Sequence, residues 1–85
     1  MSKVRYQIRF SQESMDNLSS LPPRHAAQIV RKIERLESGL HGDIKALRNA
    51  EYGFRLRMGD YRVLFDVESD RVLIQKIGHR RKIYD

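Results

Sequence analysis

The chain has 85 residues and a formal net charge of +6, with 17 lysine and arginine residues against 11 acidic ones. It contains no cysteine, which excludes disulfides and thiolate metal sites, and its three histidines lack the spacing of a metal-ligand set. No stretch has the length and apolar character of a signal peptide or a membrane span. We therefore expect one soluble, cytoplasmic domain over residues 1–85, with no metal, no cofactor and no membrane partner.

The basic residues are mostly arginines, twelve against five lysines. A planar guanidinium group binds a phosphate through two parallel hydrogen bonds, and an ammonium group cannot do this. A basic chain suggests a polyanion or an acidic protein as partner. The arginine bias favours a phosphate ligand.

The first half of the chain predicts a strand followed by two helices. Residues 3–10 alternate apolar and polar side chains, as in a half-buried strand. Residues 11–20 follow as a short helix, and residues 22–36 carry apolar side chains at helical spacing. Two consecutive helices predict a helical hairpin. Residues 40–52 show no regular pattern, and we expect a loop with at most a short turn.

Residues 53–84 predict three short strands joined by two-residue turns at Gly59–Asp60 and Ser69–Asp70. Counting from the turns sets Arg57 opposite Arg62, and it assigns two faces. The face expected to meet the helices carries Phe54, Leu56, Met58, Tyr61, Val63, Phe65, Val67, Val72 and Ile74. The other, which we call the open face, carries Arg55, Arg57, Arg62, Leu64, Asp66, Glu68, Arg71, Leu73, Gln75, Ile77 and His79.

The expected fold is therefore α+β in the order β-α-α-β-β-β, a small, mostly antiparallel sheet with a helical hairpin packed on one face. On the open face, like charges directly opposite each other destabilise a strand pair by some tenths of a kcal/mol. A polyanion bound over Arg55, Arg57 and Arg62 would explain that arrangement. The alternative is that one arginine of the opposed pair extends into solvent at the sheet edge.

The last strand leads into a basic C-terminus that contains His79, Arg80, Arg81 and Lys82. It predicts either a frayed tail or a segment that folds back beside the arginines through its apolar residues Ile83 and Tyr84. By register His79 belongs to the open face, where neighbouring arginines would favour the neutral imidazole and make it available for proton transfer.

Two segments, G-F-R-L-R-M-G-D-Y-R-V-L-F over Gly53–Phe65 and I-G-H-R-R-K-I-Y over Ile77–Tyr84, resemble the RelE/ParE toxins of bacterial type II toxin–antitoxin modules. The RelE-like branch implies a metal-independent, ribosome-dependent mRNA endonuclease. In its reaction the ribose 2′-OH attacks the adjacent phosphorus and leaves a 2′,3′-cyclic phosphate. The ParE-like alternative inhibits DNA gyrase without catalysis. A third alternative is a non-toxic basic binding module.

The resemblance also implies roles for individual residues. Arg62 and Arg80 would clamp the phosphate, and Arg55 and Arg57 would align the RNA backbone, with Arg81 as a further basic neighbour. Tyr84 would orient or stack a base. The family prototype has lysines on the strand that here carries Arg55 and Arg57, and arginine cannot act as a base. His79 is the first candidate for that role, with Lys45 and Tyr84 behind it.

The same resemblance implies two partners. One is a cognate antitoxin, small, acidic and partly disordered, which would fold as it wraps the basic surface in a toxin–antitoxin hetero-oligomer. The other is the ribosome with mRNA in its decoding site, because the open face offers few groups that could read bases.

Overall fold

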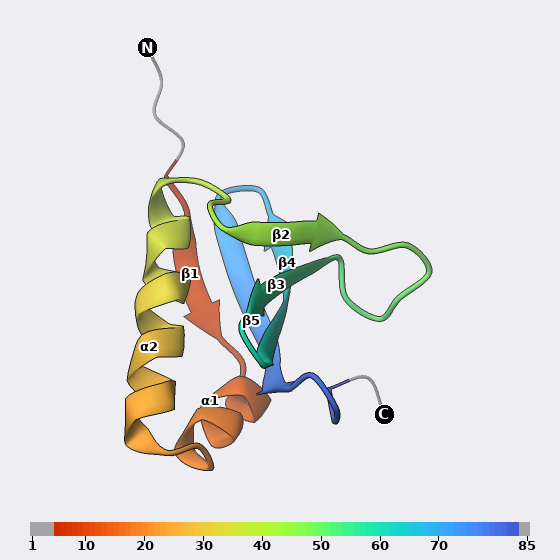
Figure 1. The fold of residues 1–85 in the computed structure, drawn as a ribbon. Helices are drawn as coiled ribbons and strands as arrows, with labels where there is room; N and C mark the ends of the chain where they lie inside the picture. The colour runs from red at the N-terminus through yellow and green to blue at the C-terminus, as the bar shows by residue number, and fades with distance from the viewer. Residues whose placement is uncertain (1–4, 84–85) are drawn as a thin grey trace.

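The computed structural model describes residues 5–83, and within them the chain forms a five-stranded sheet and two α-helices (Figure 1). The elements are β1 (Gln7–Phe10), α1 (Gln12–Ser19), α2 (Pro23–Glu34), a 3₁₀ turn η1 (Arg35–Ser38), β2 (Asp43–Ala46), β3 (Phe54–Met58), β4 (Tyr61–Glu68) and β5 (Arg71–His79). The predicted α+β class and helical hairpin are confirmed. None of the described helices is long and apolar enough to cross a membrane.

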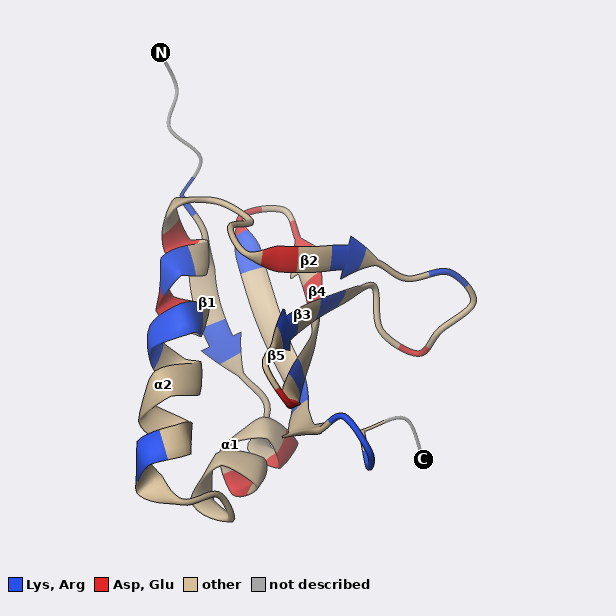
Figure 2. Ribbon diagram, viewed as in Figure 1, with Lys and Arg blue, Asp and Glu red and all other residues tan. Residues whose placement is uncertain are grey.

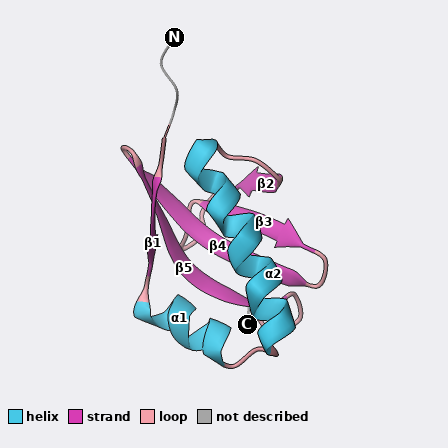
Figure 3. Cartoon of the chain, turned by 90° about the vertical axis from the view of Figure 1, so that its left-hand side faces the viewer, coloured by secondary structure: helices cyan, strands magenta, loops and turns pink. Residues whose placement is uncertain are grey.

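The strand order across the sheet is β1-β5-β4-β3-β2. β1 runs parallel to β5, whereas the other neighbouring strands are antiparallel, so the sheet is mixed but mostly antiparallel. α2 crosses one face of the sheet (Figure 3). The opposite face is the open face predicted from the sequence.

The core lies between α2 and the covered face of the sheet. Three residues of α2 and η1 are almost fully buried there, namely Ile29, Ile33 and Leu36. They pack against one side of β3, β4 and β5, with buried residues Leu56, Val63, Phe65, Val72, Ile74 and Ile77. Packing of one apolar helix stripe against one apolar sheet face is what orients the remaining side chains towards the open face.

α1 is fastened to β5 through its N-cap residue. The Ser11 hydroxyl accepts a hydrogen bond from the backbone N–H of Ser14 (3.0 Å) and donates one to the carbonyl of Gln75 (2.8 Å). The first bond satisfies one of the free donors at the start of the helix. The second joins the helix to the strand residue at which the pairing register changes.

Strand β2 was not predicted, because residues 40–52 were expected to form a loop. Its four residues pair antiparallel with β3, with Ile44 opposite Leu56 and Lys45 opposite Arg55. Ile44 is the one apolar side chain of β2 that packs against the core, so the segment is too short to show alternation. Backbone pairing with the free edge of β3 forms this strand, and composition does not reveal it.

The predicted pairing of β3 with β4 is confirmed, including Arg57 opposite Arg62. In the second hairpin the pairs near the turn, such as Glu68 with Arg71, are also confirmed. Beyond Phe65 the prediction is wrong, because the register shifts between Leu64 and Phe65 and leaves Gln75 as an extra, unpaired residue.

This bulge exchanges residues between the two faces of β5. Ile77 pairs with Val63 in the core, although it was predicted to lie opposite Arg62 on the open face. Lys76 pairs with Leu64, and Gly78 takes the place opposite Arg62. Burial of Ile77 favours the shift, since a one-residue slip in register turns every following side chain to the other face.

Candidate functional site

The open face carries two rows of neighbouring residues that run across the strands. One row is Lys45, Arg55, Leu64 and Lys76, and the other is Asp43, Arg57, Arg62 and Gly78. Figure 2 shows the basic segments of β2 and β3 and of the turn that follows β5. The structure therefore brings together the predicted residues Lys45, Arg55, Arg57 and Arg62, and it adds Lys76, which was not singled out from the sequence.

The two arginines that lie opposite each other on this face, Arg57 and Arg62, contact different partners. Arg57 is exposed, and its Nε lies 3.8 Å from Oδ2 of Asp43. Arg62 is only 8% exposed, and its Nη1 donates to the carbonyl oxygens of Gly59 (2.7 Å) and Tyr61 (2.9 Å). Because each arginine has partners of its own, the electrostatic repulsion between Arg57 and Arg62 is partly offset. The exposed ion pair between Arg57 and Asp43 contributes little to stability by itself.

The centre of the open face is closed to solvent. Leu64 is 5% exposed although it lies outside the main core cluster. Beside it, the Nε atom of Arg55 is buried and has no hydrogen-bond partner among the described residues. The open face is therefore an apolar centre with cationic side chains around it, and the long stems of such side chains can cover apolar surface.

The segment after β5 folds back onto the open face. Ile83 is buried, and a Cβ added at Gly78 would lie 3.1 Å from its Cδ1 atom, so the glycine makes room for Ile83 beside Arg62. Figure 1 shows this turn on the side of the sheet away from α2. Of the two predicted alternatives for the basic C-terminus, docking is confirmed for Ile83. Tyr84 lies outside the described residues.

Arg80 meets the same hairpin turn that holds Arg62. Its backbone N–H donates to the carbonyl of Asp60 (2.7 Å), and its Nε lies 3.7 Å from Oδ1 of Asp60. The Arg62 side chain donates to the carbonyl of Gly59, the residue before Asp60 in the turn. Two arginines that are distant in sequence therefore converge on one two-residue turn, in which Gly59 has the positive φ of 58° that the predicted turn requires.

His79 does not lie on the open face, so its predicted position is wrong. The bulge pairs it with Tyr61, and the two rings meet edge to face with centroids 5.8 Å apart. The Tyr61 hydroxyl lies 2.9 Å from Nδ1 of His25 in the first turn of α2. Nδ1 of His79 accepts a hydrogen bond from the backbone N–H of Arg81 (3.2 Å), so the neutral ring carries its proton on Nε2. In this arrangement Nε2 is a hydrogen-bond donor.

The loop between β2 and β3 is held by a carboxylate on β4. Oδ1 of Asp66 accepts a hydrogen bond from the backbone N–H of Gly53 (2.7 Å). In the same loop, burial raises the pKa of the Tyr52 phenol, and a hydrogen bond and the negative charge of Glu51 raise it further. Tyr52 therefore stays neutral at physiological pH. Within residues 5–83, no three His, Asp or Glu side chains are grouped closely enough to hold a metal ion.

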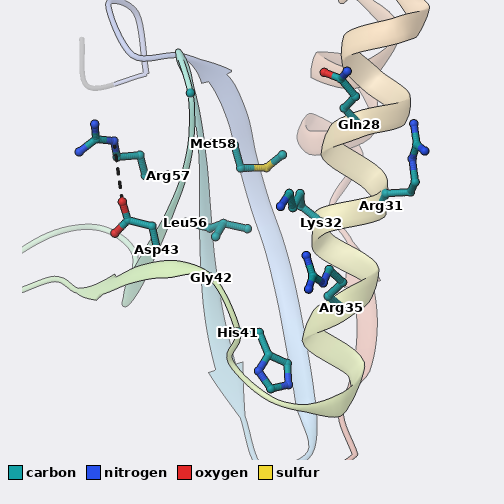
Figure 4. Close-up of a pocket in the computed structure, with 11 residues that line it drawn as sticks. Gln28, Arg31, Lys32, Arg35, His41, Gly42, Asp43, Leu56, Arg57 and Met58 are labelled. Carbon is teal, nitrogen blue, oxygen red and sulfur yellow. Dashed lines mark ion pairs between the residues drawn. The ribbon is translucent and has the colours of Figure 1, made fainter.

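A groove of about 1040 Å³ separates α2 from β2 and β3 (Figure 4). Leu56 and Met58 point into it from β3, and His41 lies at its lower end, whereas the side chains of Asp43 and Arg57 point away from α2. The opposite wall, formed by α2 and the start of η1, is polar and largely cationic, with Gln28, Arg31, Lys32 and Arg35. The groove thus has an apolar floor and basic rims. The sequence predicted that Leu56 and Met58 face the helices, but it indicated no role for these helix cations.

This small α+β domain, with a helical hairpin on one side of its sheet and cations on the other, has the architecture that the RelE/ParE resemblance implies. The chain belongs to the ParE toxin family of type II toxin–antitoxin systems, whose model matches residues 8–84. It is accordingly a toxin of a type II toxin–antitoxin system, and the predicted superfamily is confirmed.

Several RelE proteins are similar to the chain over nearly its full length. Toxin RelE3 of Methanocaldococcus jannaschii is 26% identical over 83 residues, which cover 92% of this chain and 94% of that protein. The RelBE2 toxin–antitoxin complex of Mycobacterium tuberculosis contains a chain with 31% identity and a TM-score of 0.79, covering 93% of this chain and 95% of that one. The RelB–RelE complex of Methanococcus jannaschii gives 26% identity and a TM-score of 0.75, with coverage of 91% and 95%.

Proposed function

We propose that this toxin is a ribosome-dependent mRNA endonuclease that acts in the cytoplasm and inhibits translation. The observation that supports this most directly is the convergence of Arg62 and Arg80 on the Gly59–Asp60 turn, with the docked C-terminal turn beside them. Two arginines held at one hairpin turn would suit a phosphate that gains negative charge during the reaction. Similarity to toxins named RelE supports the same choice.

In the proposed reaction the 2′-oxygen attacks the neighbouring phosphorus in line, and the bond from phosphorus to the 5′-oxygen breaks. The 2′-OH gives up its proton, the 5′-oxygen gains one, and the products are a 2′,3′-cyclic phosphate and a 5′-OH end. Arg62 and Arg80 stabilise the charge on the phosphate, while Arg55, Arg57 and Arg81 align the backbone. Lys45, His79 and Tyr84 are the candidates for proton transfer. His79 would first have to release the bond that Nδ1 now makes with Arg81.

Purified toxin in a cell-free translation extract should cut a reporter mRNA within its coding region, because the ribosome positions the strand. The same mRNA without a start codon is the matched control and should stay intact. Primer extension maps the cuts, and a plasmid assay with gyrase runs beside it. Trapped gyrase–DNA cleavage with intact mRNA would contradict the proposal and support the ParE-like alternative. Two observations favour the ParE-like alternative. The matching family model is named for ParE toxins, and positions 55 and 57 carry arginine, which cannot act as a base.

We further propose an acidic, partly disordered antitoxin as the partner of this toxin. Solved relatives are toxin–antitoxin complexes with RelB proteins. The groove beside α2 would suit an amphipathic acidic segment, whose apolar side chains would meet Leu56 and Met58 and whose carboxylates would meet Arg31, Lys32 and Arg35.

Reversing charge on this groove should release the toxin from its antitoxin. For Arg31→Glu combined with Arg35→Glu we expect antitoxin affinity to fall at least about tenfold, because carboxylates would then face carboxylates. Calorimetric titration measures the affinity, and the translation extract shows whether cleavage persists. Arg9→Glu with Arg24→Glu makes the same change in net charge at exposed positions outside the groove. An equal loss in that control would contradict docking at this groove.

A further inference from the structure

A second hollow, of about 570 Å³, lies where the C-terminal end of α1, the end of β5 and the docked C-terminal turn meet. Three cations line it, Lys76 from β5 and Arg81 and Lys82 from the turn. Among the described residues that line it there is no carboxylate. Its apolar lining comes from Leu21, Ile77 and Ile83.

Lys76 reaches this hollow because of the bulge in β5. Without the extra residue Gln75, a regular hairpin would turn Lys76 towards the covered face and the apolar core. The bulge instead pairs Lys76 with Leu64 on the open face, in the same row as Arg55. The residue is half-buried, so part of its stem packs and less motion is left to the ammonium group than on a free surface.

The neighbouring polar groups leave the hollow electropositive. Asn17 uses its Oδ1 to accept a hydrogen bond from the backbone N–H of Ile77 (2.9 Å), which turns the acceptor end of its amide towards the strand. Nδ1 of His79 is likewise taken up by the backbone N–H of Arg81. The hollow therefore offers three cations, the Nε2–H donor of His79 and an apolar wall. A phosphate joined to a nucleoside is the ligand that suits these groups.

We propose that Lys76, together with Arg81 and Lys82, binds a backbone phosphate of single-stranded RNA next to the phosphate that is cleaved. The hollow and the arginine pair share Ile83, which lines the hollow and packs on Gly78 opposite Arg62. One strand can therefore pass from the hollow to the turn that holds Arg62 and Arg80. This proposal rests on the proposed RNA substrate, but it concerns binding and can be measured without the ribosome.

The test is the salt dependence of RNA binding by the isolated full-length protein. A fluorescent RNA oligonucleotide with 2′-O-methyl groups, which block attack by the 2′-oxygen, is titrated at several KCl concentrations. Loss of one phosphate contact should lower the slope of log affinity against log salt by about 0.7 and weaken binding roughly threefold to tenfold. We expect this result for Lys76→Met, and we expect Lys76→Arg to restore the wild-type slope.

Arg24→Met is the matched control, because it also removes one positive charge, from an exposed position on α2 that lines neither hollow. It should leave the slope unchanged. An unchanged slope for Lys76→Met in a folded protein, or an equal loss for Arg24→Met, would overturn the proposal. Failure of the endonuclease assignment is recognised separately, by intact mRNA in the translation extract together with normal dependence of RNA binding on Lys76.

Discussion

Replacing Arg62 by alanine is expected to lower translation-dependent mRNA cleavage by about 100- to 1000-fold, the loss typical of removing one fixed electrostatic donor. Arg62 is buried, and the bonds from Nη1 to the carbonyls of Gly59 and Tyr61 hold its guanidinium group in one place. A donor held in this way needs no reorganisation when charge develops on the phosphate. The measurement is the cleavage rate of a reporter mRNA at a fixed concentration of folded toxin.

The control for this variant is Arg57→Ala, which removes the cross-strand partner of Arg62. Arg57 is exposed and ion-paired with Asp43, so we expect a smaller loss of cleavage than for Arg62. Arg62→Ala also removes hydrogen bonds from a charged donor and should cost about 1.5–3 kcal/mol of stability. Denaturant unfolding gives the folded fraction, and wild-type cleavage by the folded variant would contradict the role of Arg62.

The largest expected effect on stability is that of Phe65→Ala. Phe65 is fully buried and stacks on Phe54, with ring centroids 5.4 Å apart. Truncating a buried phenylalanine costs about 3–5 kcal/mol, through lost transfer free energy and the cavity that remains. A chain of this length has a total stability of about 4–13 kcal/mol. We therefore expect a variant that is partly unfolded at 37 °C, with a much lower urea midpoint.

Met15→Ala is the control for this stability loss. Met15 is 45% exposed on α1, so its truncation removes little buried area and should change the free energy of unfolding by less than about 1 kcal/mol. Both variants are compared in urea with the same fluorescence or circular dichroism signal. A midpoint for Phe65→Ala equal to that of Met15→Ala would contradict the assignment of Phe65 to the centre of the core.

Much of the candidate site could be predicted by counting. A two-residue turn at Gly59–Asp60 fixes the pairing register of β3 with β4. The opposed positions of Arg57 and Arg62 could therefore be predicted from the residue types in that turn. The docking of Ile83 was one of two predicted outcomes, and its apolar side chain favoured it. Ile77 and His79 were assigned to the wrong face, because a bulge leaves no clear mark in an alternating pattern.

The sequence by itself determined the α+β class, the helical hairpin, three of the strands along the second half of the chain and the family. These rest on local periodicity, turn residues and motifs, which are properties of neighbouring residues. Only the tertiary structure decided that Asp43–Ala46 is a strand, that Lys76 belongs to the open face and that Arg62 and Arg80 meet at one turn. Each of these depends on contacts between distant segments. Strand β2 forms by pairing with β3. In β5 and in the C-terminal turn, burial of Ile77 and of Ile83 favours a bulge and a folded-back segment over a regular strand and a free tail.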